Sequence, residues 1–88
     1  MKLREKIEKY INITKSAIGE AELKKTKNKK AILLIEMAKN YYKDALYFLA
    51  KKDYVNAFAA INYAHAFLDA AALLGLIKTK NRKLFMVD

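Results

Sequence analysis

The chain has 88 residues, a formal net charge of +9, no Cys and no Pro. This length accommodates one small domain with a modest core, and the absence of Cys excludes disulfides and thiolate metal sites. Ala, Leu, Ile and Lys are abundant, which is typical of an all-helical protein. We therefore expect a single all-α domain over residues 1–88, stabilised by helix packing or by oligomerisation.

The positive charge is concentrated at the two ends of the sequence. Residues 1–30 contain ten Lys or Arg against four Glu, residues 78–88 contain four against one Asp, and residues 31–77 are balanced. The two clusters comprise Lys24, Lys25, Lys27, Lys29 and Lys30, and then Lys78, Lys80, Arg82 and Lys83. Such clusters attract nucleic acid or anionic membrane surfaces, although a lysine-rich run at a helix junction is most often a solvated loop. Since only two basic residues are Arg, we expect poor base-specific recognition.

The first predicted helix covers residues 2–24. Apolar and small residues recur on one face at helical spacing, with Lys, Glu and Asn on the opposite face. The inward face comprises Leu3, Ile7, Tyr10, Ile11, Thr14, Ala17, Ile18 and Ala21. Because the first ten residues are too charged for the apolar core of a secretory signal, we expect a cytoplasmic protein.

The second predicted helix covers residues 29–51. Its inward face comprises Ala31, Leu34, Ile35, Ala38, Tyr41, Tyr42, Ala45, Leu46 and Leu49. Lys51 and Lys52 follow at its C-terminal end, where basic side chains favour the helix dipole, and Asp53 is placed to cap the next helix. So short a connection predicts an antiparallel hairpin with the third helix.

The third predicted helix covers residues 53–75. The segment 54–77 contains only four strongly polar side chains, of which Asn62, His65 and Asp69 fall on one stripe that we interpret as its solvent edge. An Asp near the centre of a membrane span costs about 2.5–3.5 kcal/mol on insertion scales, so we expect no span. Gly75 is a suitable left-handed residue to end the helix.

One side of the third helix lacks an obvious cover within the chain. Tyr63, Phe67, Ala70 and Leu74 point away from the predicted inward stripe, toward the back of the helix. The apolar run 84–87 in the short C-terminal tail, a second copy of the chain or another protein would have to cover them. We predict a homodimer with these four residues at its interface, because a two-fold contact covers the same stripe on both copies.

The only candidate for chemistry involves His65 and Asp69, with Glu36 at about the same level of the hairpin. One His and two carboxylates could hold a divalent metal or support acid–base catalysis. A His followed four residues later by Asp is more often a surface pair worth a few tenths of a kcal/mol. We therefore expect no catalysis, no metal and no cofactor, and predict an interaction or assembly module. The alternatives are a nucleic-acid-associated protein using the two basic ends and a metal-dependent enzyme.

Two short resemblances concern the hairpin of the second and third helices. The spacing of Asp53, Tyr54, Ala57, Ile61 and Ala64 is similar to half of a tetratricopeptide-type hairpin, but the chain is too short for the three units of a solenoid. The hairpin also looks like the HEPN helical domains, some of which are ribonucleases with an Arg shortly before a His. No Arg occurs in the six residues before His65, so this resemblance implies no catalytic role.

A longer resemblance covers residues 41–77 and depends on the order and spacing of aromatic, Asp, Ala and Gly positions. These positions are Tyr41, Tyr42, Asp44, Ala45, Phe48, Leu49, Lys52, Asp53, Tyr54, Ala57, Ile61, Tyr63, Ala64, His65, Leu68, Asp69, Ala70, Leu74, Gly75 and Leu76. In them the chain resembles a family of small archaeal proteins known as domain of unknown function 357. The resemblance implies a compact helical protein of an archaeal cytoplasm, and it implies no activity.

Overall fold

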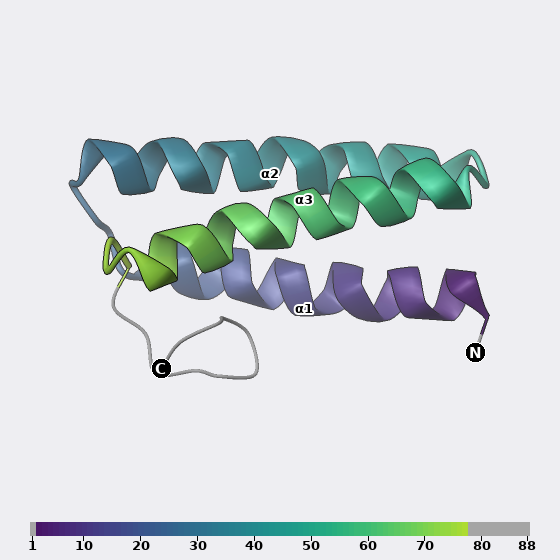
Figure 1. Ribbon diagram of the computed structural model, residues 1–88, viewed down its shortest axis with the longest axis horizontal. Coiled ribbons are helices and arrows are strands. Elements are labelled where there is room, and N and C mark those ends of the chain that lie inside the picture. The colour runs from purple at the N-terminus through teal and green to yellow at the C-terminus, as the bar shows by residue number, and fades with distance from the viewer. Residues whose placement is uncertain (1, 78–88) are drawn as a thin grey trace.

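The computed structural model describes residues 2–77, which form a bundle of three α-helices (Figure 1). α1 spans Leu3–Leu23, α2 spans Lys29–Ala50 and α3 spans Tyr54–Leu73. The predicted all-α three-helix fold is therefore confirmed, and each helix begins and ends within two residues of its predicted boundary. The predicted tail, with its apolar run 84–87, lies outside the described residues.

Each helix runs antiparallel to the one before it, and α3 lies in front of the space between α1 and α2 (Figure 1). α2 and α3 form the predicted antiparallel hairpin and pack together most extensively. Completely buried Ala residues recur along both helices of this hairpin, at positions 38, 45, 57, 64 and 71. Because Ala has a small side chain, these residues allow the two helix backbones to approach closely.

The core consists of two clusters of buried side chains, one at each end of the bundle. The first is built around Ile18, Ile35 and Leu68, and the second around Ile7 and Ile61. Full burial of each large aliphatic side chain contributes about 1.5–3 kcal/mol. Thr14 is the one polar residue among the described residues that is completely buried, and it lies on the inward face of α1 as predicted.

Side-chain caps fix the beginnings of the second and third helices. Asp53 Oδ1 accepts a hydrogen bond from the backbone N–H of Asn56 at 3.2 Å, which confirms the predicted cap of α3. Asn28 Oδ1 accepts one from the backbone N–H of Ala31 at 3.0 Å and caps α2. Since each cap satisfies a backbone N–H that lacks a partner within the helix, both stabilise the junctions of the bundle.

Left-handed residues end the second and third helices. Gly75 has a φ of 72°, as predicted, and Leu76 N–H donates to the carbonyl of Ala71 at 2.9 Å to close the Schellman motif. Lys52 has a φ of 60° and occupies the corresponding position after α2, where Asp53 N–H donates to the carbonyl of Phe48 at 2.9 Å. Lys52 therefore adopts a conformation that Gly favours.

The side of α2 that faces α1 is more open than predicted. The prediction that Leu46 lies in the core is wrong, because 42% of its surface is exposed. The reason is that α1 and α2 pack together less extensively than either packs with α3, which leaves the side chains between them partly uncovered. No helix within residues 2–77 is both long enough and apolar enough to cross a bilayer.

Candidate functional site

Three aromatic rings meet on the surface where α2 lies against α3. The ring centroid of Tyr41 is 5.5 Å from that of Tyr63 and 5.6 Å from that of Phe67. The rings of Tyr41 and Phe67 are inclined by only 17°, which is a stacked arrangement. We call Tyr41, Tyr63 and Phe67 the aromatic seam.

The four predicted interface residues do not all lie on an open back of α3. Tyr63 and Leu74 are exposed, whereas Ala70 and Phe67 are half-buried. Phe67 packs against the first core cluster as well as against Tyr41, so the interpretation that its ring lies on the back of α3 is wrong. Because α2 lies close to α3 on this side, the long aromatic side chain reaches the neighbouring helix instead of solvent.

On the other side of α3, His65 faces α1 and Asp69 lies beside it. His65 Nε2 lies 3.5 Å from Asp69 Oδ1, and His65 Nδ1 lies 3.4 Å from the hydroxyl of Thr14. Asn62, His65 and Asp69 form the stripe that the sequence pattern predicts to be the solvent edge of this helix. The side chains of His65 and Asp69 are only 27% and 18% exposed, so the prediction holds for Asn62 alone, which is exposed. The His65 imidazole therefore connects a buried hydroxyl of α1 to a carboxylate of α3.

A cavity of about 320 Å³ opens beside this imidazole between α1 and α3. Its lining residues are Tyr10, Ile13, Thr14, Ile61, Asn62 and His65. Both imidazole nitrogens already face Thr14 or Asp69, and the Asn62 amide donates to the carbonyl of Phe58 at 2.9 Å. The imidazole and the Asn62 amide group at this cavity are thus engaged in contacts within the bundle, which suits a structural role.

The three side chains considered as metal ligands do not converge. Glu36 lies on α2, where its carboxylate is 3.7 Å from Lys39 Nζ, whereas Asp69 contacts His65 on α3 and His65 contacts Thr14 on α1. No group of three potential ligands among His, Cys, Asp and Glu comes together within residues 2–77. The hypothesis that Glu36 joins the other two is wrong, because placing two residues at one level of a hairpin does not turn them toward each other.

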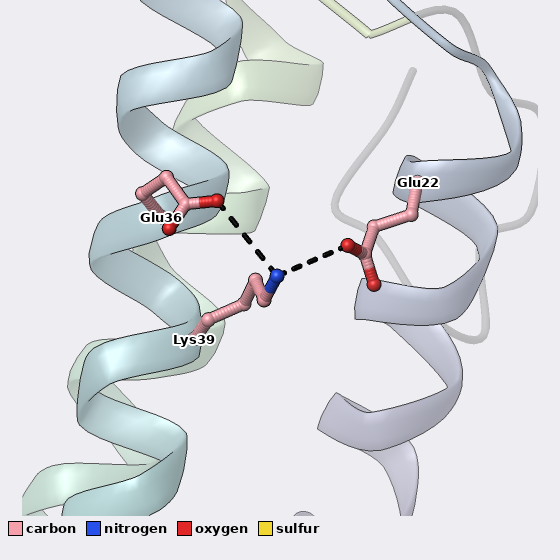
Figure 2. Close-up of polar contacts among 3 residues, drawn as sticks. All are labelled: Glu22, Glu36 and Lys39. Atoms are coloured by element: carbon pink, nitrogen blue, oxygen red, sulfur yellow. Dashed lines mark hydrogen bonds and ion pairs between the residues drawn. The ribbon is translucent and has the colours of Figure 1, made fainter.

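Instead, Glu36 belongs to a charged network that joins α2 to α1 (Figure 2). Lys39 Nζ lies 3.1 Å from Glu22 Oε2 on α1, and in Figure 2 it stands between the two carboxylates. The hydrogen bond to Glu22 and the negative charges of both Glu side chains raise the pKa of Lys39 above its ordinary value. Lys39 is therefore held in its charged form.

The first basic cluster lies on the connection between α1 and α2. Its five lysines are all exposed, and none of them forms an ion pair with another described residue. Lys25 has a φ of 48° and ends α1 in the left-handed conformation. The second cluster, Lys78, Lys80, Arg82 and Lys83, lies outside the described residues.

Comparison with known proteins places the chain in a family. No curated protein matches the sequence, and no solved structure matches the fold at a significant level. The family model for a protein of unknown function, DUF357, matches residues 9–77, which is most of the chain and includes all three helices in whole or in part. The chain therefore belongs to the DUF357 family of proteins of unknown function.

Proposed function

We propose that this protein is a non-catalytic interaction module that self-associates through the aromatic seam and the apolar residues beside it. The observation that carries the proposal is an exposed apolar surface on two helices, one of which, α3, contains no Lys or Arg. In this arrangement two copies bury each other's seam through a two-fold contact.

Large apolar side chains extend the aromatic seam along both helices. Leu33, Met37 and Tyr41 recur every four residues on one face of α2, and Leu33 is 61% exposed. On α3, Tyr63 is 58% exposed and Leu74 is 70% exposed. Because α2 and α3 are antiparallel, Leu33 and Leu74 lie toward the same end of the hairpin. Contiguous exposed apolar surface of this kind is characteristic of protein contacts.

The charge distribution supports a second copy as the occupant of this surface. Between Lys52 and Lys78 the sequence contains no Lys or Arg, and the one charged side chain of α3, Asp69, contacts His65 on the side of the helix away from the seam. Two protomers that each carry nine excess positive charges repel one another over most of their surfaces. The α3 side of the seam contributes none of this positive charge, so apolar burial there can determine how two copies meet.

Light scattering coupled to size exclusion tests this proposal. We expect the wild-type protein to elute with the mass of two chains, and the double variant Tyr63→Glu/Leu74→Glu to elute as a monomer. Both positions are exposed, so the variant keeps its core; Phe67 is unsuitable for this purpose because its ring packs on the core. Circular dichroism verifies that each variant remains helical.

The matched control is the double variant Leu23→Glu/Val55→Glu. Both residues are exposed apolar positions outside the seam, and the change in net charge is the same. We expect this variant to remain dimeric. A monomeric wild type, or equal dissociation of the two double variants, would contradict the proposal.

A second candidate function is binding to a nucleic acid backbone through the first basic cluster. The observation in its favour is that five exposed lysines lie within seven residues without an ion pair among the described residues. A lysine cluster free of carboxylates can release counterions from a phosphate backbone. The cluster does not supply stacking side chains, so this candidate predicts binding without base preference.

Filter binding to duplex DNA across a range of salt concentrations tests this second candidate. The logarithm of the association constant should fall as the logarithm of the salt concentration rises. Replacing all five lysines with Gln should make this slope shallower by about 0.9 for each phosphate that the variant no longer neutralises. The control replaces five other exposed lysines, at positions 2, 9, 15, 51 and 52. Absence of binding at low salt, or the same slope change in the control, would rule the candidate out.

A further inference from the structure

The pair of helices α1 and α2 carries a groove that no residue of α3 lines among the described residues. A cavity of about 370 Å³ is bounded by the side chains of Lys15, Ile18, Lys39, Tyr42, Lys43 and Leu46. Ile18 is buried and Leu46 is 42% exposed, so apolar surface is accessible here between lysine side chains. The groove is therefore apolar inside and cationic at its edges.

The groove continues along the two helices past the Lys39 network. A second cavity of about 170 Å³ is lined by Ala21, Glu22, Lys25, Thr26, Ile32, Ile35 and Glu36. Lys39, Glu22 and Glu36 form the bridge between the two parts (Figure 2). From Ile32 to Leu46 the groove extends about 21 Å at 1.5 Å per residue, which is the length of about four helical turns.

Two of the lysines at the edge of the larger part are available for new ion pairs. Lys15 on α1 and Lys43 on α2 have no carboxylate partner among the described residues, and both are exposed. Lys39 between them is already held by Glu22 and Glu36. The larger part of the groove thus presents positive charge on both of its walls with apolar side chains between them, whereas the smaller part also carries the carboxylates of Glu22 and Glu36.

We propose that this groove binds an amphipathic helix of another protein, one that carries acidic residues on both sides of its apolar stripe. A helix matches the site because the groove runs straight between two antiparallel helices, at the position that a fourth helix occupies in a four-helix bundle. Apolar side chains at i, i+3, i+4 and i+7 would enter between Ile18, Tyr42 and Leu46. Acidic residues beside the stripe would pair with Lys15 and Lys43.

A second copy of the chain does not suit this groove. A two-fold contact centred on the larger part of the groove would bring Lys15 and Lys43 close to the same lysines of the partner, and like charges placed together are destabilising. The groove is also distinct from the aromatic seam. Tyr41 and Lys43 are two residues apart, so about 200° of helical rotation separates the two surfaces on α2. The inference therefore goes beyond self-association and does not depend on it.

Isothermal titration calorimetry with designed peptides tests the proposal on the full chain. The probe is a monomeric helical peptide of about 18 residues, with Leu on one stripe and Glu on both sides of it; a second peptide has the same Leu stripe flanked by Lys. We expect the Glu-flanked peptide to bind and the Lys-flanked peptide to bind at least about tenfold more weakly, because its charges oppose Lys15 and Lys43.

Paired variants determine whether the groove is responsible. Lys15→Glu/Lys43→Glu should weaken binding of the Glu-flanked peptide by about tenfold or more. The control Lys2→Glu/Lys9→Glu makes the same change in charge at exposed positions outside the groove, so it should leave binding nearly unchanged. Leu46→Asn should also weaken binding, and Leu73→Asn, at an exposed position on α3, should not. Circular dichroism shows whether each variant is folded.

Several results would overturn the inference. They are no binding of the Glu-flanked peptide, equal binding of both peptides, and equal losses in the two double-Glu variants. Phosphatidylglycerol vesicles and a single-stranded RNA serve as competing probes. The decisive result is that the vesicles or the RNA bind the wild type but not Lys15→Glu/Lys43→Glu, and that the Glu-flanked peptide does not bind the wild type. In that case the groove recognises a lipid or a phosphate backbone, and the proposed helix is excluded.

Discussion

The Nδ1 atom of His65 on α3 lies 3.4 Å from the hydroxyl of Thr14 on α1. This contact connects two helices that are far apart in the sequence. Thr14 is completely buried, so its hydroxyl depends on partners within the protein. Replacing Thr14 with Val keeps the shape of the side chain and removes the hydroxyl. We expect a loss of about 0.5–1.5 kcal/mol in the free energy of unfolding, measured by urea denaturation.

The control for this variant is Ser16→Ala. Ser16 is exposed on the same helix, so removing its hydroxyl should change stability by less than about 0.5 kcal/mol. If Thr14→Val is as stable as the wild type or more stable, the contact with His65 makes no net contribution to the packing of α1 on α3.

Lys52 provides a prediction of increased stability. Its φ of 60° is unfavourable for a residue with a Cβ atom and favourable for Gly. We expect Lys52→Gly to raise the free energy of unfolding by up to about 1 kcal/mol, detected as a higher melting temperature. Lys51→Gly removes the same charge from the adjacent residue, whose φ is −85°, and should not stabilise the protein. Equal effects at both positions would contradict the argument from backbone conformation.

The buried Ala residues of the α2–α3 hairpin should be intolerant of larger side chains. Ala64 is completely buried, so Ala64→Leu must displace neighbouring atoms and should cost about 1–3 kcal/mol in the free energy of unfolding. Ala59 is exposed on the same helix, and Ala59→Leu should be nearly neutral. Thermal denaturation of both variants provides the comparison. A neutral Ala64→Leu would mean that the two helices can separate without loss of stability.

The Lys39 network predicts a dependence on alkaline pH. Because the pKa of Lys39 is raised in the folded protein, the folded state holds this proton more tightly than the unfolded state does. The contribution of the network is therefore fully present below the ordinary lysine pKa, and it is lost as the pH rises through the pKa of the folded state. We expect Lys39→Gln to be less stable than the wild type at neutral pH and to approach it at alkaline pH.

An NMR titration of the lysine side chains measures this effect directly. Lys39 should titrate at a higher pH than an ordinary lysine side chain, because of its contacts with Glu22 and Glu36. Lys43→Gln is the matched variant for the denaturation experiments, since it also removes one lysine from α2. If Lys39 titrates as an ordinary lysine side chain does, the contacts with Glu22 and Glu36 do not persist in solution.

Features determined by neighbouring residues could be predicted from the sequence. The α3 cap at Asp53 and the left-handed Gly75 depend on hydrogen bonds within a few residues, and both predictions are confirmed. The helical periodicity also predicts the six buried residues of α1, including Thr14, although Leu3 on the same predicted face is exposed. In these cases the residue types alone determine the local structure, because the interactions involve one helix or one turn.

Features determined by how helices turn toward one another could not be predicted in the same way. The exposure of Leu46 depends on the distance between α1 and α2, and the position of Phe67 depends on the proximity of Tyr41. Glu36 shares a level with Asp69 in the hairpin but contacts Lys39, because the rotation of α2 about its axis directs it toward α1. The sequence pattern of one helix contains no information about this rotation.

The aromatic seam and the groove occupy opposite sides of α2, and this separation determines what an assembly could do. A dimer joined at the seam would carry its two grooves facing outward, each free to bind its own helix. Two target segments on one protein, or on two molecules held side by side, would then be bound together, and the second contact would form at a high effective concentration. Such an assembly would act as a bivalent clamp whose avidity exceeds the affinity of either groove alone.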